Sequence, residues 1–300
     1  MRISIFTTIT NPEKYRYAWK EALANYCDFA DEVIVIDGHH WYDEKTKKEV
    51  GLDHHALFVA KYPQYNEKTR WRYMNWPEEW DWSELPKHLN LGLESCTGDW
   101  AIKMDIDYLI HESEFDKIKK KLFEYLVCEI PVAYFVKFNI LNRFEGYEKA
   151  VLPLAINTKK AKELNIKYGI ALDEKTDWCY PILVSGEDEK RKIPQGKKLP
   201  DGMTMPLSAN IYNYDYFFRT KEVAKSEFHR FSKAYATAFN WSWGINPEES
   251  FEIFVRQMKG RYNKKPQLKE VFHPKHIIGR INKMMPDEFG YNNWNNFENL

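Results

Sequence analysis

The sequence predicts an α/β fold in which a doubly wound, mixed sheet is flanked by helices. Residues 31–38 (DEVIVIDG) form a continuous β-branched run, which is typical of a parallel strand buried on both faces. A second strand pattern, Ile3–Ile9, precedes it, and apolar residues at helical spacing lie between the two over residues 13–26. The chain therefore opens β-α-β, and we expect its crossover to be right-handed.

The same alternation continues to about residue 115. A helix is predicted within residues 53–60, followed by a strand over 71–76. A second helix over 83–95 and a strand over 98–107 come next. This order is that of a doubly wound α/β domain.

The second half of the chain is less regular. We expect a charged helix over 112–126, strands over 131–142 and 152–157, a short helix from Thr158, a strand over 208–216, a helix over 220–239 and a helical tail over 240–300 with a loose, Asn-rich end. Residues 173–206 are rich in turn formers and charge, which predicts a long loop that is either a functional lid or disordered.

Composition excludes several classes of protein. Of the 300 residues, 44 are Lys or Arg and 44 are Asp or Glu, and this balance argues against a dedicated nucleic-acid binder. The four cysteines are scattered without a C-x-x-C pair, so neither a zinc site nor a disulfide framework is indicated. The start of the chain is too short and polar for a signal peptide, and no apolar run is long enough to span a bilayer. We therefore expect a cytoplasmic protein with reduced thiols.

Two aspartates, Asp105 and Asp107, close the apolar run over 98–107. If that run is a strand, both carboxylates lie at its carboxyl end, where open α/β sheets build their ligand sites. Two aspartates flanking one residue suit a hard divalent cation and the diphosphate that it neutralises.

Three segments together resemble family-2 glycosyltransferases of the GT-A fold. They are the strand at 33–38, the phrase NLGLESCTGDW at 90–100 and the sequence Asp105-Ile106-Asp107. In that family an N-x-G helix and a G-[DE]-[WY] turn precede a strand that ends in D-x-D, and all these parts occur here in the same order. The resemblance implies a GT-A domain over 1–220, with a nucleotide-sugar half (1–115) and an acceptor half (116–220), followed by a helical C-terminal extension (221–300).

A weaker similarity lies further on. Residues 211–216 (IYNYDY), Lys225 and the sequence His229-Arg230-Phe231 resemble a segment that in some relatives reads H-Y-x-Y, followed by a helix with K-x-x-R-[FY]. The relatives' His falls on Asn213, so the third protein ligand of a metal is left open, with His229 and Asp215 as substitutes. An aromatic core strand and an ordinary helix are an equally good interpretation.

The family's chemistry gives roles to several residues. The resemblance implies a metal-dependent, inverting transferase that moves a sugar from a nucleotide-diphosphate sugar to a glycan, a lipid-linked glycan or a protein, with Mn²⁺ or Mg²⁺ as cofactor. Asp107 would bind the metal, and Asp105 would contact the ribose and assist the metal. Three further residues are expected near the nucleotide: Thr8, Asp37 and Lys87.

Inversion requires a base that deprotonates the acceptor hydroxyl. The candidates are carboxylates of the acceptor half, namely Asp173, Glu174, Asp177, Glu187 and Asp188. Among these, Asp177 is slightly favoured because Trp178 follows it, with Glu174 and Asp188 next.

Two alternatives stay open. A sugar-phosphate nucleotidyltransferase would carry a glycine-rich phosphate loop after the first strand, and residues 7–12 (TTITNP) contain no glycine, which counts against it. A non-catalytic carbohydrate-binding protein, or a transferase that has lost its chemistry, would keep the aromatic residues and use the acids structurally. The histidine pairs at 39–40 and 54–55 are interpreted as solvated loop residues, and the basic tail (259–283) as a solvated helical cap that could also touch a membrane surface.

Overall fold

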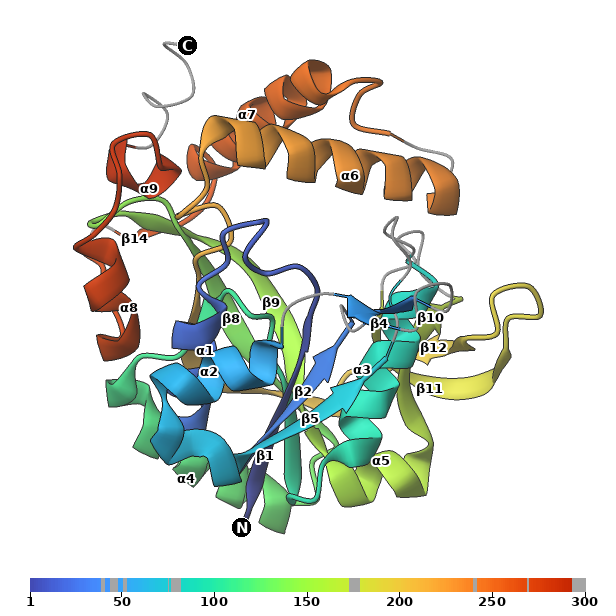
Figure 1. The fold of residues 1–300 in the computed structure, drawn as a ribbon. Helices are drawn as coiled ribbons and strands as arrows, with labels where there is room; N and C mark the ends of the chain where they lie inside the picture. Colours follow the sequence, from blue (N-terminus) through green and yellow to red (C-terminus); the bar gives the residue numbers. More distant parts are fainter. Residues whose placement is uncertain are drawn as a thin grey trace.

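The computed structural model describes residues 1–38, 41–43, 48–50, 53–74, 76, 82–172, 179–239, 242–268 and 270–292. Figure 1 shows a central sheet with helices on both sides. The predicted α/β class is confirmed. Three of the candidate bases, Asp173, Glu174 and Asp177, lie outside the described residues.

The main sheet is mixed, as predicted. Its nine strands within the described residues run in the order β5 (Thr69–Tyr73), β2 (Glu32–Asp37), β1 (Ile3–Ile9), β6 (Trp100–Lys103), β9 (Gly146–Asn157), β8 (Val132–Ile140), β13 (Thr204–Asn213) and β7 (Tyr108–Leu109), with β14 (Gln267–Leu268) beside β9. The first four are parallel to one another, whereas β9 is antiparallel to both β6 and β8.

Side chains that alternate along β1 enter two separate cores, one on each face of the sheet. Ile3 and Ile5 pack into the core formed with α1 (Trp19–Phe29) and α4 (Phe115–Val127). Phe6 packs into the other, with α3 (Glu84–Ser95) and α5 (Thr158–Leu164). Because a strand side chain changes face at every residue, this alternation is what allows helices to cover both faces.

Two glycines of the phrase NLGLESCTGDW are required by close packing. A Cβ at Gly92, in α3, would lie 2.4 Å from Cδ2 of Phe6. A Cβ at Gly98 would lie 2.8 Å from the backbone nitrogen of Ser4. The glycines therefore let α3 and the following turn approach β1 closely.

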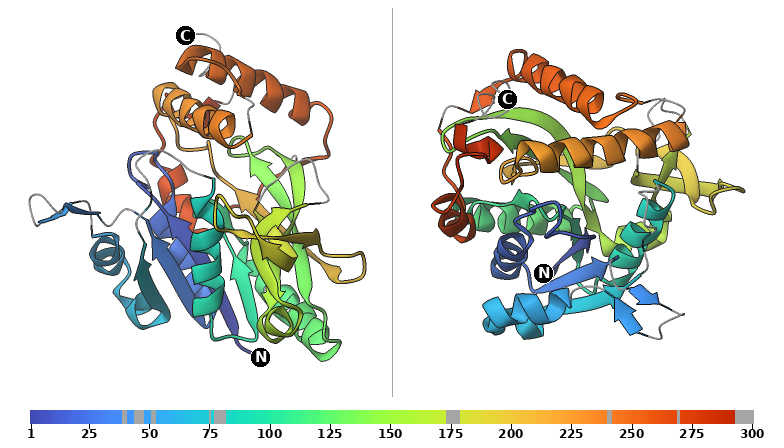
Figure 2. Two further views of the ribbon diagram at one scale, coloured as in Figure 1. Left: turned by 90° about the vertical axis from the view of Figure 1, so that its right-hand side faces the viewer. Right: turned by 45° about the horizontal axis from the view of Figure 1, so that its top comes forward.

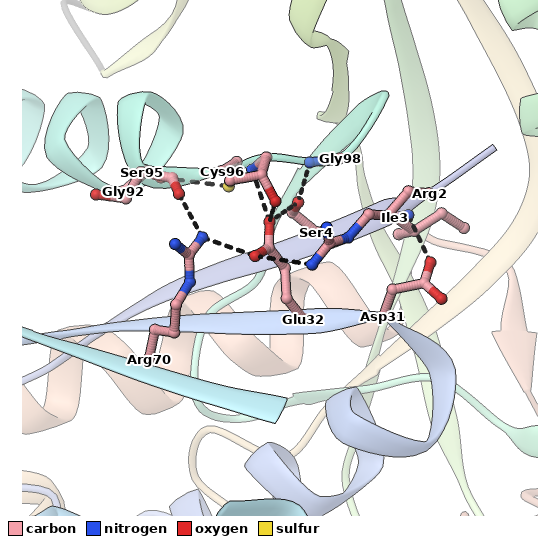
Figure 3. Close-up of polar contacts among 11 residues, drawn as sticks. Arg2, Ile3, Ser4, Asp31, Glu32, Arg70, Gly92, Ser95, Cys96 and Gly98 are labelled. Atoms are coloured by element: carbon pink, nitrogen blue, oxygen red, sulfur yellow. Dashed lines mark hydrogen bonds and ion pairs between the residues drawn. The ribbon is translucent and has the colours of Figure 1, made fainter. Parts of the chain in front are cut away.

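The same turn is fixed to the sheet by a buried carboxylate (Figure 3). Oε1 of Glu32 accepts hydrogen bonds from Oγ of Ser4 at 2.5 Å and from the backbone nitrogen of Thr97 at 2.6 Å. Its Oε2 lies 2.6 Å from Nη2 of Arg70, which also donates to the carbonyl of Ser95. This cluster ties β1, β2, β5 and the end of α3 together at the amino ends of the parallel strands.

Most predicted elements are present, with shifted ends. The first helix begins at Trp19 instead of residue 13, since Arg16 adopts a φ of +57°, which a right-handed α-helix does not accommodate. The helix expected near 53–60 is α2 (His54–Lys61), capped by the side chain of Asp53 and followed by a 3₁₀ turn, η1 (Pro63–Lys68). A second 3₁₀ turn, η2 (Glu112–Glu114), precedes α4.

The loop predicted over residues 173–206 is wrong for residues 180–187 and 194–198, and residues 173–178 lie outside the described part of the chain. Residues in this range form β11 (Tyr180–Glu187) and β12 (Pro194–Lys198), which pair with each other and with β10 (Ile166–Ala171) in a small second sheet. Two short strands, β3 (Trp41–Asp43) and β4 (Lys48–Val50), make a separate hairpin.

The C-terminal segment returns to the main sheet. Figures 1 and 2 show α6 (Lys221–Phe239) and α7 (Pro247–Tyr262) across the end of the sheet opposite the N-terminus. After them, β14 joins β9, α8 (Lys275–Ile281) packs against α1, and α9 (Phe289–Asn292) follows. No helix in the described part of the chain has the length and apolar character needed to cross a membrane.

Candidate functional site

A cavity of about 410 Å³ lies at the carboxyl ends of β1 and β6. Thr8 and Thr10 from the end of β1, Asp105 and Asp107 from the turn after β6, and Asp215 from the turn after β13 all line it. The strand itself ends at Lys103, so the D-x-D sequence lies in the turn that follows it. Other parts of the wall come from β8 and β9 (Lys137 and Lys149), from α6 (Arg230 and Phe231) and from aromatic residues including Trp76, Trp82, Tyr168 and Tyr180.

The backbone of the D-x-D turn is held from two sides. The hydroxyl of Tyr26, on α1, bonds to the carbonyl oxygens of Asp105 and Tyr108. The backbone nitrogen of Tyr214, after β13, donates to the carbonyl of Asp107 at 2.8 Å. The two carboxylates are therefore presented to the cavity by a fixed turn.

The two carboxylates differ in charge compensation. Burial opposes ionisation of Asp105, but Nζ of Lys103, at 2.5 Å, holds the pKa of that carboxyl below its ordinary value. Asp107 is 6% exposed, and among the described residues its carboxylate makes no hydrogen bond or ion pair. Burial, followed by the negative charges of Asp215 and Asp105, raises the pKa of Asp107 well above its ordinary value. A cation beside Asp107 would relieve this repulsion.

The carboxylates around the cavity supply only part of the ligands that a divalent cation needs. Asp105, Asp107 and Asp215 line one cavity, but Asp215 is paired with Arg219 at 2.8 Å. Within the described ranges no three His, Cys, Asp or Glu side chains are grouped closely enough to hold a metal ion. A cation at Asp107 would thus take most of its ligands from water or from a bound diphosphate, which is how Mg²⁺ is often held.

Asn213 occupies the position where the resembled family has its histidine. Its Nδ2 donates to Oδ1 of Asn139 at 2.8 Å, and its own Oδ1 accepts from the backbone nitrogen of Asp215 at 3.0 Å. Both ends of this amide are engaged in fixing the turn that carries Asp215.

The structure places His229 away from the two aspartates. This residue is not among those lining the cavity, and its Nδ1 lies 3.5 Å from Oγ of Ser250 on α7. Burial and the neighbouring Lys233 lower the pKa of its imidazole. Asp215, the other substitute considered for a third ligand, does line the cavity.

The remaining candidate residues are divided between the cavity and its surroundings. Thr8 lines the cavity, whereas Lys87 pairs with Glu84 on α3 at 2.5 Å and is not part of the wall. Asp188 lies beyond β11 and pairs with Arg191 at 3.3 Å, also outside the wall.

Asp37 is buried against a histidine. Its carboxylate lies 2.8 Å from Nδ1 of His54, whose Nε2 lies 3.2 Å from Glu13. Interpreting His54 as a solvated loop residue is wrong, because it is 1% exposed and starts α2. Burial lowers the pKa of His54, but the two carboxylates raise it to about 9, so the imidazole is charged at neutral pH.

Sequence analysis did not identify Lys137, Lys149 or Arg219 as residues of the site. A signal existed for Lys137, since it continues the buried face of β8 set by Ala133 and Phe135. A lysine at an inward position of a strand is rarely tolerated without a role. No comparable pattern marks Arg219, which is fully buried between segments far apart in the chain.

The chain matches no protein-family model and no curated protein. Among solved structures, S. aureus TarS 1-349 aligns with 88% of this chain and 72% of its own, at 15% identity and a TM-score of 0.40. The mannosyltransferase PcManGT from Pyrobaculum calidifontis, in complex with GDP-Man and Mn²⁺, aligns with 85% of this chain and 68% of its own, at 13% identity and a TM-score of 0.39. At these TM-scores the likeness carries no argument about function.

Proposed function

We propose that this chain is a glycosyltransferase that uses a nucleotide-diphosphate sugar as donor, with inversion and with Mn²⁺ or Mg²⁺ as cofactor. The observation that carries the proposal is Asp107, a buried carboxylate without a cationic partner in the described part of the chain, in a cavity at the carboxyl ends of parallel strands. The sequence order that leads to it, the N-x-G helix, the G-D-W turn and D-x-D, supports the same assignment.

Asp107 would hold the cation, with Asp105 and Asp215 beside it. When bound, the divalent cation supplies positive charge where the leaving diphosphate becomes more negative. Thr8, at the end of β1, would contact the nucleotide, while Asp37 would act from behind the wall through its pair with His54. Lys87 remains a candidate only if a ligand extends along α3.

Asp177 is proposed as the base that activates the acceptor hydroxyl, with Glu174 and Asp188 as alternatives. Asp177 and Glu174 lie outside the described residues, between β10 and β11. Cys179, Tyr180 and Pro181, which begin two residues after Asp177, line the cavity, and this favours Asp177 and Glu174 over Asp188. The acceptor is proposed to be a glycan, a lipid-linked glycan or a protein, and cytoplasmic location is retained as a prediction.

In the proposed division into a domain over 1–220 and an extension over 221–300, the extension contributes residues to the cavity wall and a strand to the main sheet. Arg230 and Phe231 of the extension form part of the cavity wall, and β14 pairs with β9. We therefore expect a chain truncated after residue 220 to lack both a complete site and a stable sheet edge.

Donor hydrolysis tests the proposal directly. The protein is incubated with UDP- and GDP-sugars, with Mn²⁺ or with EDTA, and release of nucleoside diphosphate is measured. We expect release from one class of donor, dependent on Mn²⁺ and lost in Asp107→Asn. A folded protein that releases no nucleotide and binds glycans alone would favour the carbohydrate-binding alternative.

A further inference from the structure

Two lysines from adjacent strands face the same cavity. Lys137 lies on β8 and Lys149 on β9, and these strands are antiparallel. Lys137 pairs with Ala150, while the next residue, Phe138, pairs with Glu148. Lys149 is therefore the extra residue of a β-bulge opposite Lys137, and bulges of this kind turn a side chain toward a site.

Among the described residues, neither lysine has a carboxylate partner. The part of the chain that the structure describes contains no acidic oxygen within 4.0 Å of either Nζ. Nζ of Lys137 donates to the hydroxyl of Tyr108 at 2.8 Å and lies 4.9 Å from the centre of its ring. The other cations of the wall are paired, Lys103 with Asp105 at 2.5 Å and Arg230 with Glu227 at 2.7 Å.

Without a bound ligand, burial of the two lysines lowers the stability of the folded protein. Lys137 is 7% exposed, and an ammonium group loses hydration on burial without recovering it from a neutral hydroxyl. Burial, then the like charge of Lys149, lowers the pKa of Lys137 to about 7. The buried hydroxyl of Tyr168, also in the cavity wall, has no hydrogen-bond partner among the described residues.

We propose that Lys137 and Lys149 form an oxyanion-binding site that holds a phosphate or carboxylate group of a ligand in this cavity. An oxyanion between the two ammonium groups would offset their positive charge and accept several of their hydrogen bonds. The proposal does not depend on sugar transfer, because any ligand that brings such a group would be held. Two sources are considered: the diphosphate of a nucleotide donor, and an acidic group on the acceptor.

Calorimetric titration of the full chain with pyrophosphate, inorganic phosphate, glucose 6-phosphate and glucuronate at pH 7 and low salt tests the proposal. We expect at least one of these anions to bind, and Lys137→Met and Lys149→Met each to weaken binding by about tenfold or more. Lys149→Arg should retain most of the affinity because it keeps the charge. Lys121→Met, which alters an exposed lysine of α4 outside the cavity, is the matched control and should bind as the wild type does.

The source of the oxyanion is resolved by competition. Loss of anion binding in the presence of saturating UDP or GDP assigns the lysines to the donor diphosphate. Simultaneous binding of glucose 6-phosphate or glucuronate and the nucleotide assigns them to an acidic acceptor. Both results support the oxyanion site.

A stability measurement separates this role from a structural one. Without ligand, Lys137→Met should melt above the wild type, since it removes a buried cation that lacks a partner. If it melts lower and binds the four anions unchanged, the lysines serve to balance Asp105 and Asp107, and the proposal is overturned. A wild-type protein that binds none of the four anions also overturns it.

Discussion

Nη2 of Arg219 lies 2.8 Å from Oδ1 of Asp215, and the guanidinium group of Arg219 is fully buried. Its Nε donates to the carbonyl of Tyr15 at 3.1 Å, and its Nη2 lies 4.0 Å from the buried carboxylate of Glu227. One side chain thus joins the turn after β1, the turn after β13 and α6. Since Asp215 lines the cavity, Arg219 also fixes part of the cavity wall.

Replacing Arg219 by Met should be strongly destabilising. Asp215 would lose its ion pair, while Glu227 would keep its closer pair with Arg230. Breaking a buried pair costs about 3–5 kcal/mol. Urea unfolding followed by tryptophan fluorescence measures the change. Lys121→Met is the control, since its pair with Glu124 is exposed, and it should shift stability by less than about 0.5 kcal/mol. Equal effects of the two variants would contradict the role given to Arg219.

Stability should depend on pH through His54. Its pKa is raised from 6.5 to about 9 in the folded protein, so the protonated imidazole stabilises the fold fully below about pH 6.5. This contribution, up to about 3 kcal/mol in the free energy of unfolding, should be lost as the pH rises through 9. Urea unfolding at pH 6.5 and pH 9.5 measures it, with His54→Gln as control. If the free energy of unfolding changes equally between the two pH values in the wild type and in His54→Gln, His54 is not the group responsible.

Gly92 and Gly260 offer a matched pair of helical glycines. Alanine at Gly92 would place its Cβ 2.4 Å from the ring of Phe6, forcing α3 away from β1 at a cost of about 1–3 kcal/mol. Alanine at Gly260, in α7, meets nothing within 4 Å and should stabilise by about 0.5–1 kcal/mol. Thermal unfolding of both variants should therefore give changes of opposite sign, and a stabilising Gly92→Ala would refute the packing argument.

Glu32→Gln tests the cluster in Figure 3. The amide keeps the shape but replaces a charged acceptor of Arg70 by a neutral group, and its NH₂ end cannot accept hydrogen bonds. We expect a loss of about 1–3 kcal/mol in the free energy of unfolding. Glu94→Gln, at an exposed site 3.4 Å from Lys167, should be neutral. A neutral Glu32→Gln would mean that the turn at residues 96–98 is held by packing alone.

The first half of the fold was accessible from sequence. Ile3–Ile9 was predicted with its observed ends, because a β-branched run buried on both faces has no helical periodicity to compete with it. The strand assignments also predict that Thr8, Asp105 and Asp107 lie close together, because the carboxyl ends of parallel strands meet at one edge of a sheet.

The second half was not accessible for identifiable reasons. β12 contains Gly196, where a Cβ would lie 1.9 Å from the carbonyl of Leu183, so the same glycine that suggested a loop is needed for strand pairing. The pairing of Asp37 with His54 joins residues across a crossover and leaves no pattern in the sequence. The bulge that turns Lys149 into the cavity depends on the register of β8 and β9, which no local preference specifies.

The central claim is that Asp107 takes a divalent cation together with a nucleoside diphosphate. The measurement that tests it most directly is calorimetric titration of UDP and GDP into the protein, with Mn²⁺ and with EDTA, for wild type and Asp107→Asn. The account predicts that one nucleotide binds the wild type with Mn²⁺, that EDTA abolishes this binding, and that Asp107→Asn lacks it while remaining folded. Binding of neither nucleotide to a folded wild type, or equal binding by Asp107→Asn, would contradict it.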